Sequence, residues 1–267
     1  MQSSILFRKV NTLKSLSLYQ EKNTLIHRID PISKLFYIVT AIAIPIIMPT
    51  KTAALLCLAA SIALLLMGRV FRRVIPIISF SFVVLTSIIV IQGLFYHGNI
   101  TPVLQAGPLV FYREGLVYAL QICIRVVNIL CAFAILVLTT KPSDLIESLV
   151  RRGLSPRIGY VLSSVLQIIP QMASTMDTIT DAQRSRGMET EGRFITRIKA
   201  FFPLIGPVVM NSLINTRERA MALEVRGFNS KAQKTFLNEE FNSPYNLFIK
   251  LFLIASIVFT VVWRILI

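Results

Sequence analysis

The chain has 267 residues, of which 54% are hydrophobic and 15% charged, and its mean hydropathy is +0.68. A composition this apolar is typical of membrane proteins, and it excludes a secreted disulfide scaffold, a disordered tail and most soluble enzymes. The formal net charge is +15, which we interpret as basic cytoplasmic loops in contact with anionic lipid rather than as a surface for nucleic acid.

Five apolar runs are long enough, or nearly so, to cross the roughly 30 Å hydrocarbon core of a bilayer as helices. The first two are short and close to the lower limit for a span. The predicted spans are residues 32–48, 52–67, 74–95, 116–138 and 247–267. The sequence therefore predicts an all-α polytopic membrane protein with about five transmembrane helices.

Basic residues are distributed unevenly among the segments that connect these spans. Residues 1–34 carry six Lys or Arg and residues 68–73 carry three, whereas the alternate connections carry Lys51 and Arg113 alone. Cytoplasmic connections are the ones enriched in Lys and Arg. We therefore expect a multi-pass protein of the cell (plasma) membrane, with the N-terminus in the cytoplasm and the C-terminus outside.

Residues 139–246 differ from the rest because they hold 14 of the 28 Lys and Arg and 10 of the 13 Asp and Glu. We predict three parts: residues 1–138 with an N-terminal cytoplasmic segment and spans 1–4, a cytoplasmic domain over 139–246, and a final span over 247–267. Two apolar stripes at three- and four-residue spacing predict two long amphipathic helices in that domain. The stripes are Val165, Ile169, Met172, Met176 and Ile179, then Phe202, Ile205, Val209, Leu213, Ala220 and Leu223.

Both predicted helices end in the same pattern, Ala-x-x-x-Arg-Gly. The first runs from Ala182 to Gly187 and the second from Ala222 to Gly227, 40 residues later. One copy would indicate only a helix stop, since glycine after a helix is a common left-handed cap and a basic residue there interacts favourably with the helix dipole. Two copies suggest two similar partners or one symmetric dimer, because an arginine at a helix tip projects five donors.

The doubled Arg-Gly end resembles the signature of the transmembrane T component of energy-coupling factor transporters, the ABC-type importers of vitamins and metals. The resemblance covers most of the chain. It rests on Ser185-Arg186-Gly187 and Val225-Arg226-Gly227, on Asp30-Pro31 followed by Lys34-Leu35 before the first span, and on Thr139 to Leu145 after the fourth. Ser185 stands where the family commonly has alanine.

The resemblance implies a non-catalytic subunit that binds no cofactor itself. Two partner ABC ATPases, identical or different, would bind ATP and Mg²⁺, and a membrane-embedded S component would bind the vitamin or metal ion. The amphipathic helices would then be coupling helices that transmit ATPase movement to the S component. The ATPase-binding residues that it implies are Ala182, Ser185, Arg186, Gly187, Ala222, Val225, Arg226 and Gly227. No motif in the chain specifies the transported substrate.

Three polar residues share one face of the fourth predicted span: Gln121, Arg125 and Asn128. An ionised group in the middle of a span is costly and usually faces protein or water. Two interpretations stay open for Arg125. It makes a functional polar contact, within the bundle or with the S component, or it is a structural arginine that binds backbone carbonyls.

Two other classes of protein compete with this interpretation. A membrane enzyme acting on lipid or isoprenoid phosphates could hold magnesium and a diphosphate with Asp177, Asp181, Arg184, Arg186 and Glu189. These aspartates form no recognisable two-carboxylate motif, and the hypothesis leaves the Arg-Gly repeat unexplained. A conventional ABC permease usually presents a single coupling loop, and no Glu-Ala-Ala loop occurs here.

The sequence predicts neither catalytic residues nor a metal site. His27 and His97 fall on opposite sides of the membrane in the predicted topology, so they cannot share a zinc ion. Residues 187–194 have two glycines at the spacing of a phosphate-binding loop, but Arg-Phe stands where that loop needs Lys-Ser or Lys-Thr.

Overall fold

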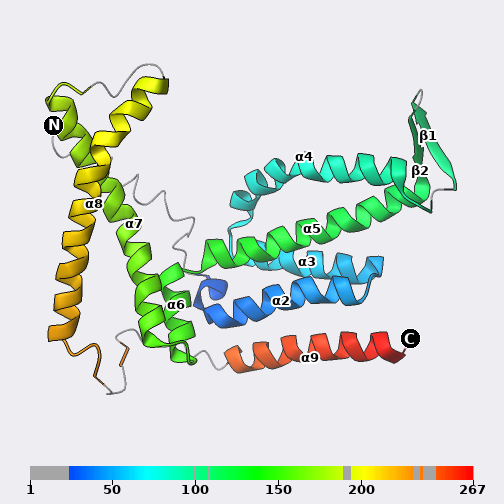
Figure 1. Ribbon diagram of the computed structural model, residues 1–267. Coiled ribbons are helices and arrows are strands. Elements are labelled where there is room, and N and C mark those ends of the chain that lie inside the picture. Colours follow the sequence, from blue (N-terminus) through cyan, green and yellow to red (C-terminus); the bar gives the residue numbers. More distant parts are fainter. Residues whose placement is uncertain are drawn as a thin grey trace. The chain divides into compact units, whose positions relative to one another are not determined.

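Figure 1 shows the computed structural model of the chain, which describes residues 24–98, 100–106, 109–188, 194–230, 235–236 and 245–266. Contacts divide these residues into two units, which we describe separately. The bundle unit comprises residues 24–152 and 245–266. The paired-helix unit comprises the described residues between 153 and 236. Outside the described residues lie most of the basic N-terminal segment, Glu189 of the enzyme hypothesis, and Ile267 at the end of the last predicted span. The predicted domain limits stay a prediction.

The bundle unit contains five apolar helices at the positions of the five predicted spans. They are α2 (Pro31–Ile47), α3 (Lys51–Met67), α4 (Phe71–Phe95), α5 (Arg113–Thr139) and α9 (Tyr245–Leu266), and a 3₁₀ turn, η1 (Leu25–Arg28), precedes them. By length and composition, α4, α5 and α9 can cross a membrane, whereas α2 and α3 are shorter apolar helices of 17 residues. The prediction of an all-α polytopic membrane protein is confirmed.

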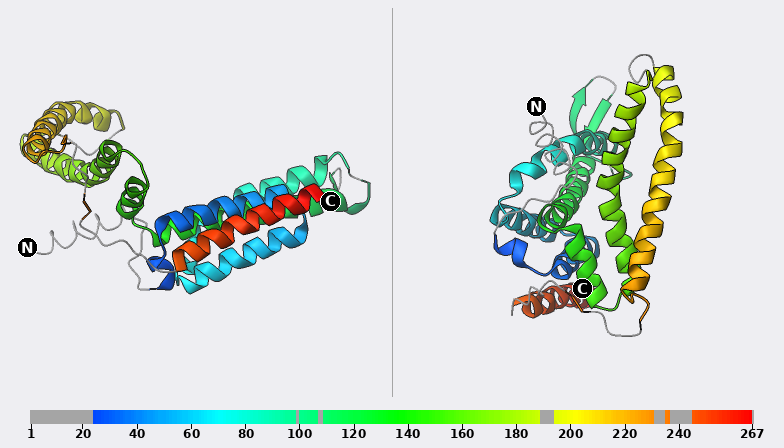
Figure 2. Two further views of the ribbon diagram at one scale, coloured as in Figure 1. Left: turned by 90° about the horizontal axis from the view of Figure 1, so that it is seen from below. Right: turned by 90° about the vertical axis from the view of Figure 1, so that its left-hand side faces the viewer.

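Helix α5 lies at the centre of the bundle and α4 and α9 lie at its sides. In the most apolar window of each helix, 39% of the residues of α5 are buried, against 11% for α4 and for α9. Helix α5 packs on α2, α3 and α4, and α9 packs on α2 (Figure 1; Figure 2, left). Leu65, Val74 and Cys131 form the core where α3, α4 and α5 meet. The outward apolar side chains of α4 and α9 are then suited to contact lipid.

A short hairpin that was not predicted from the sequence connects α4 to α5. Strands β1 (Pro102–Ala106) and β2 (Leu109–Tyr112) pair antiparallel, with a register irregularity between Pro102 and Leu104. Glu114, in the first turn of α5, accepts hydrogen bonds from the backbone N–H of Ile100 and from the N–H and hydroxyl of Thr101. The carboxylate therefore ties the start of the hairpin to the start of the span.

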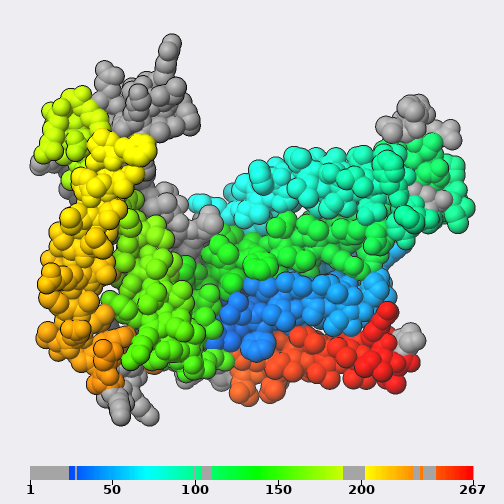
Figure 3. Space-filling view, viewed as in Figure 1, coloured from blue at the N-terminus to red at the C-terminus, as the bar shows by residue number. Residues whose placement is uncertain are grey.

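The paired-helix unit consists of α7 (Pro156–Ser185) and α8 (Phe194–Val225), the two amphipathic helices that the apolar stripes predict. A shorter helix, α6 (Pro142–Arg151), precedes them and belongs to the bundle unit. Helices α7 and α8 are antiparallel and lie side by side (Figure 2, right; Figure 3).

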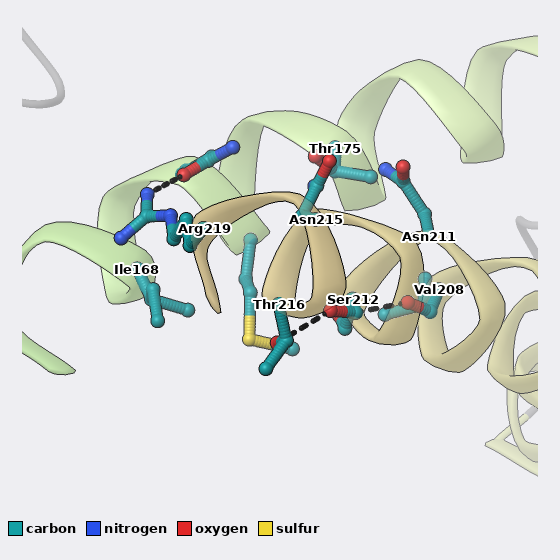
Figure 4. A pocket seen from close by; sticks show the side chains of 10 residues that line it. Ile168, Thr175, Val208, Asn211, Ser212, Asn215, Thr216 and Arg219 are labelled. Carbon is teal, nitrogen blue, oxygen red and sulfur yellow. Dashed lines mark hydrogen bonds between the residues drawn. The ribbon is translucent and has the colours of Figure 1, made fainter. Parts of the chain in front are cut away.

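A small groove between α7 and α8 is lined by seven polar and three apolar residues (Figure 4). At one end of the groove, Arg219 of α8 donates to the side-chain oxygen of Gln171 of α7 at 2.8 Å. Farther along, the ring of Tyr160 in α7 packs on that of Phe228, just after α8, with the centroids 5.2 Å apart. These contacts fix which end of α7 lies beside which end of α8.

Candidate functional site

Helices α7 and α8 end in the same backbone geometry. At the end of α7, the N–H of Gly187 donates to the carbonyl of Arg184 at 2.9 Å and that of Met188 to Gln183 at 3.1 Å. This pair of bonds is a Schellman cap, which requires a residue in the left-handed region. Gly187 supplies it, with φ of +87°.

Helix α8 repeats this cap. The N–H of Gly227 donates to the carbonyl of Glu224 at 2.9 Å, that of Phe228 donates to Leu223 at 3.0 Å, and φ of Gly227 is +67°. The prediction that the two glycines stop the two helices is confirmed. In both cases the arginine directly before the glycine occupies the last position of the helix end, where its side chain leaves the final turn.

All eight residues that the resemblance assigns to ATPase binding are exposed: Ala182, Ser185, Arg186, Gly187, Ala222, Val225, Arg226 and Gly227. Val225 is 89% exposed. Within the part of the chain that the structure describes, the side chain of neither Arg186 nor Arg226 makes a hydrogen bond or an ion pair. Both guanidinium groups are therefore available to an acceptor on another protein.

The two arginine tips lie at opposite ends of the helix pair (Figure 1). Phe228, two residues after Arg226, packs on Tyr160 near the start of α7. Arg186 lies at the far end of the same helix, about 40 Å from Tyr160 at a rise of 1.5 Å per residue. At this separation, one binding groove could not hold both tips.

At the end of the bundle where α2 begins, the Asp-Pro-x-x-Lys sequence is buried and connects several elements. The carboxylate of Asp30 caps α2 by accepting from the N–H of Ile32 at 3.2 Å, and its other oxygen accepts from Arg152 at 2.5 Å and Lys250 at 2.6 Å. Lys34 donates from Nζ to the carbonyl of Thr139 at 3.0 Å and to the hydroxyl of Thr140 at 3.1 Å. The sequence before the first span is thus joined to the sequence after the fourth.

The three polar residues of α5 have different environments in the structure. Asn128 is fully buried, donates to the carbonyl of Ala41 in α2 at 2.8 Å and accepts from the hydroxyl of Ser61 in α3 at 2.7 Å. Gln121 donates to the carbonyl of Pro49 at 2.5 Å. Arg125 is partly buried, its Nε is buried without a hydrogen-bond partner, and it makes no other polar contact among the described residues. The predicted set therefore holds one buried group with its bonds made, one group bonded at an exposed position, and one group without a polar contact.

Several residues of these networks are absent from the sequence-based prediction. Arg152, Asn246 and Lys250 all bond to Asp30, and Ser61 with Tyr37 completes the network around Asn128. One of these residues, Lys250, could have been found from the sequence. Lys250 is a cation in an otherwise apolar span, and such a residue normally has a partner.

The described residues of the lipid-phosphate enzyme hypothesis, which leave out Glu189, do not form a metal site. Asp181 and Arg184 are an exposed pair at 4.0 Å, one turn apart on α7, and Asp177 is also exposed. Over the residues with a described position, no three His, Cys, Asp or Glu lie close enough to hold a metal ion. This hypothesis gains no support from the geometry.

The bundle and the paired helices define the class, an all-α polytopic membrane protein with two exposed arginine-tipped helices inserted before its last span. Residues 22–236 match the CbiQ family, described as cobalt transport protein, and the chain belongs to this family.

Several relatives align over most of their own length. The energy-coupling factor transporter transmembrane protein EcfT of Staphylococcus aureus is 26% identical, with 81% of this chain and 84% of that protein covered. EcfT of Streptococcus equi subsp. equi is 29% identical, with 82% and 85% covered. The resemblance to T components is confirmed, and the chain is a transmembrane component of an energy-coupling factor transporter in a membrane.

A different kind of relative is a putative ABC transporter ATP-binding protein of Bifidobacterium longum. It is 27% identical over 80% of this chain, but the alignment covers only 28% of that protein. A segment similar to most of this chain is therefore part of a much longer protein whose name refers to ATP binding.

Proposed function

We propose that this chain is the non-catalytic scaffold that couples two ABC ATPases, identical or different, to a substrate-binding S component during vitamin or metal-ion uptake. The observation that carries the proposal is the pair of identical helix ends, about 40 Å apart, each with an exposed arginine that has no partner in the described chain. Two similar tips at opposite ends of one helix pair are suited to bind one ATPase each.

ATP and Mg²⁺ bind to the ATPases in this proposal, and the chain itself contributes docking and movement. An arginine at each tip donates to carboxylates and carbonyls in a groove of one ATPase, and Val225 and Ala222 add apolar contact at the second tip. When the ATPases approach and separate, α7 and α8 transmit the displacement to the S component. The family description and the names of the relatives support this role, as does the relative with ATP binding in its name.

The orientation follows from charge. We place the N-terminus and the paired-helix unit in the cytoplasm, where the ATPases find ATP, and the C-terminus outside. A reporter enzyme that is active only outside the cell is expected to be active when it is fused after Ile267 or within the connection between α4 and α5. The same reporter fused near residue 190 is expected to be inactive.

The test of docking is recovery of the ATPases with a tagged chain that carries both Arg186→Glu and Arg226→Glu. We expect the ATPases to be lost while the chain stays monodisperse with unchanged helix content. Arg217→Glu is the matched control, since it reverses an exposed arginine of α8 away from the tips. Undiminished recovery of both ATPases with the double variant would contradict the proposal.

The single variants test the one-tip, one-ATPase arrangement. With two different ATPases, Arg186→Glu is expected to release one of them preferentially and Arg226→Glu the other. With identical ATPases, either variant is expected to reduce the ATPase content by about half. Equal loss of both ATPases from each single variant would mean that the tips do not act on separate subunits.

A further inference from the structure

Arg125 lies near the middle of the length of α5. It is in α5, about 18 Å along the helix from Arg113 and about 21 Å from Thr139 at 1.5 Å per residue. Half of a hydrocarbon layer is about 15 Å thick, which is longer than an arginine side chain. An arginine near a helix end can extend its charge to the headgroups, but one at this depth cannot do so without distorting the bilayer.

An unpaired charge at this position is unfavourable. Arginine keeps its proton in proteins, so it cannot become neutral when it is surrounded by lipid. A charged arginine at the centre of a span is costly even on insertion scales. Such residues therefore pair with an acceptor, and Arg125 has none among the described residues.

The apolar helices that the structure describes hold no carboxylate that could pair with Arg125 inside the membrane. The five apolar helices contain a single acidic residue, Glu114, at the end of α5. Glu114 already accepts hydrogen bonds from Ile100 and Thr101. The two polar neighbours of Arg125 on its own face, Gln121 and Asn128, are bonded elsewhere. A counter-charge must therefore come from another molecule.

We propose that Arg125 pairs with a carboxylate carried by a membrane helix of a partner protein, at the middle of the bilayer. The identification of that partner as the S component rests on the proposed function. Gln121 and Asn128 place this face of α5 beside α2 and α3. The partner helix therefore approaches the bundle where these helices meet, and its Asp or Glu accepts two parallel hydrogen bonds from the planar guanidinium.

The experiment uses the complete complex, with the tagged chain, both ATPases and the S component expressed together. Arg125→Met removes the charge and keeps an unbranched side chain, Arg125→Lys keeps a charge without the planar fork, and Arg264→Met is the control at the exposed end of α9. We expect Arg125→Met to lower S component recovery tenfold or more. Recovery with Arg125→Lys is expected to lie between that with Arg125→Met and that with the native chain. Arg264→Met is expected to leave recovery unchanged.

ATPase recovery in the same samples distinguishes this proposal from the proposed function. If Arg125→Met retains both ATPases and loses the S component, the intramembrane pair is supported. Unchanged S component recovery would overturn it. The proposal would also be overturned if the S component is retained but native mass spectrometry finds fewer phospholipids per complex, because the acceptor would then be a lipid phosphate.

A charge exchange tests the pair even if Arg125→Met folds poorly. Arg125→Glu is combined in turn with Asp→Arg or Glu→Arg at each carboxylate in the spans of the S component. Restored recovery with one such combination supports the proposal and identifies the partner residue. Failure of every combination, with the reversed S components folded on their own, overturns it.

Discussion

Arg152 donates to Oδ2 of Asp30 at 2.5 Å, across 122 residues of chain. Arg152 is the last residue of the bundle before the paired-helix unit begins. Lys250, in the helix that follows that unit, donates to the same oxygen at 2.6 Å, and the N–H of Asp30 donates to Asn246 at 3.4 Å. One residue at the start of α2 therefore holds the chain both where it leaves the bundle and where it returns.

Asp30→Asn is expected to destabilise the bundle. The amide keeps an oxygen that can cap α2, but it removes the negative charge that Lys250, only 17% exposed, and Arg152 share. Removing one partner of a buried pair leaves a poorly solvated charge, and we expect a loss of about 2 kcal/mol after allowing for the exposure of Arg152. Thermal unfolding in detergent measures it.

Glu147→Gln is the control for the loss of a carboxylate charge, because it breaks the ion pair between Glu147 and Arg151 within one turn of α6. Such a pair is worth about 0.5 kcal/mol or less. Equal shifts of the midpoint in Asp30→Asn and Glu147→Gln would show that the carboxylate of Asp30 has no special structural role.

Valine in place of Gly187 or Gly227 is expected to weaken ATPase recovery without unfolding the helices. Both glycines have positive φ, and a Cβ would meet no atom within 4 Å, so the penalty comes from the backbone alone. That penalty is about 1 to 2 kcal/mol, and it favours unwinding of the cap that orients the arginine. Circular dichroism and ATPase recovery are the two measurements.

Asparagine at these two positions is the matched control because it adopts the left-handed region more readily than valine. We expect Gly187→Asn and Gly227→Asn to retain most of the ATPase. Asparagine and valine variants with the same recovery would mean that the backbone conformation of the caps is unimportant for docking.

Ser61→Ala is expected to destabilise the bundle more than its size suggests. The hydroxyl of Ser61 donates to Asn128 at 2.7 Å and lies 2.7 Å from the hydroxyl of Tyr37. Its removal leaves a buried amide oxygen with no donor, at a cost of about 1 to 3 kcal/mol. Ser81→Ala is the control, since that exposed hydroxyl bonds only to the carbonyl one turn before it. Equal melting temperatures for the two variants would contradict the prediction.

Alanine in place of Gly93 is expected to destabilise the bundle. A Cβ at Gly93 in α4 would lie 2.9 Å from the ring of Phe111 in β2, so the ring must shift, at about 1 to 3 kcal/mol. Thermal unfolding measures the change, and a stabilising Gly93→Ala would contradict the close packing.

The positions of the spans and of the two tips could be predicted from sequence because each depends on local chemistry. A helix in lipid must satisfy its backbone internally and present about 20 apolar residues, which hydropathy along the chain detects. The caps need a glycine at a fixed place, which a short pattern reveals at Gly187 and Gly227. Neither inference required knowledge of which residues meet in space.

The contacts of Asp30 and the hairpin could not be predicted in the same way. Arg152 and Lys250 follow Asp30 by 122 and 220 residues, and many cations near helix ends could have been its partner. The hairpin strands lack the strict alternation that predicts a strand, so the turn signal Gly107-Pro108 between them did not by itself predict a pairing. For Arg125, the sequence left two interpretations open because partners contributed by other helices are not encoded locally.

Because Arg152 and Lys250 share one oxygen of Asp30, the paired-helix unit is suited to exchange between related chains. Arg152 and Lys250 meet at one atom, so the two junctions of an exchange would lie close together in the recipient bundle. Insertions whose ends are adjacent are the ones that hosts tolerate best. Chimeras that carry the paired helices of a relative between these two residues are therefore expected to fold, and under the proposed function they would exchange the ATPases bound by the chain.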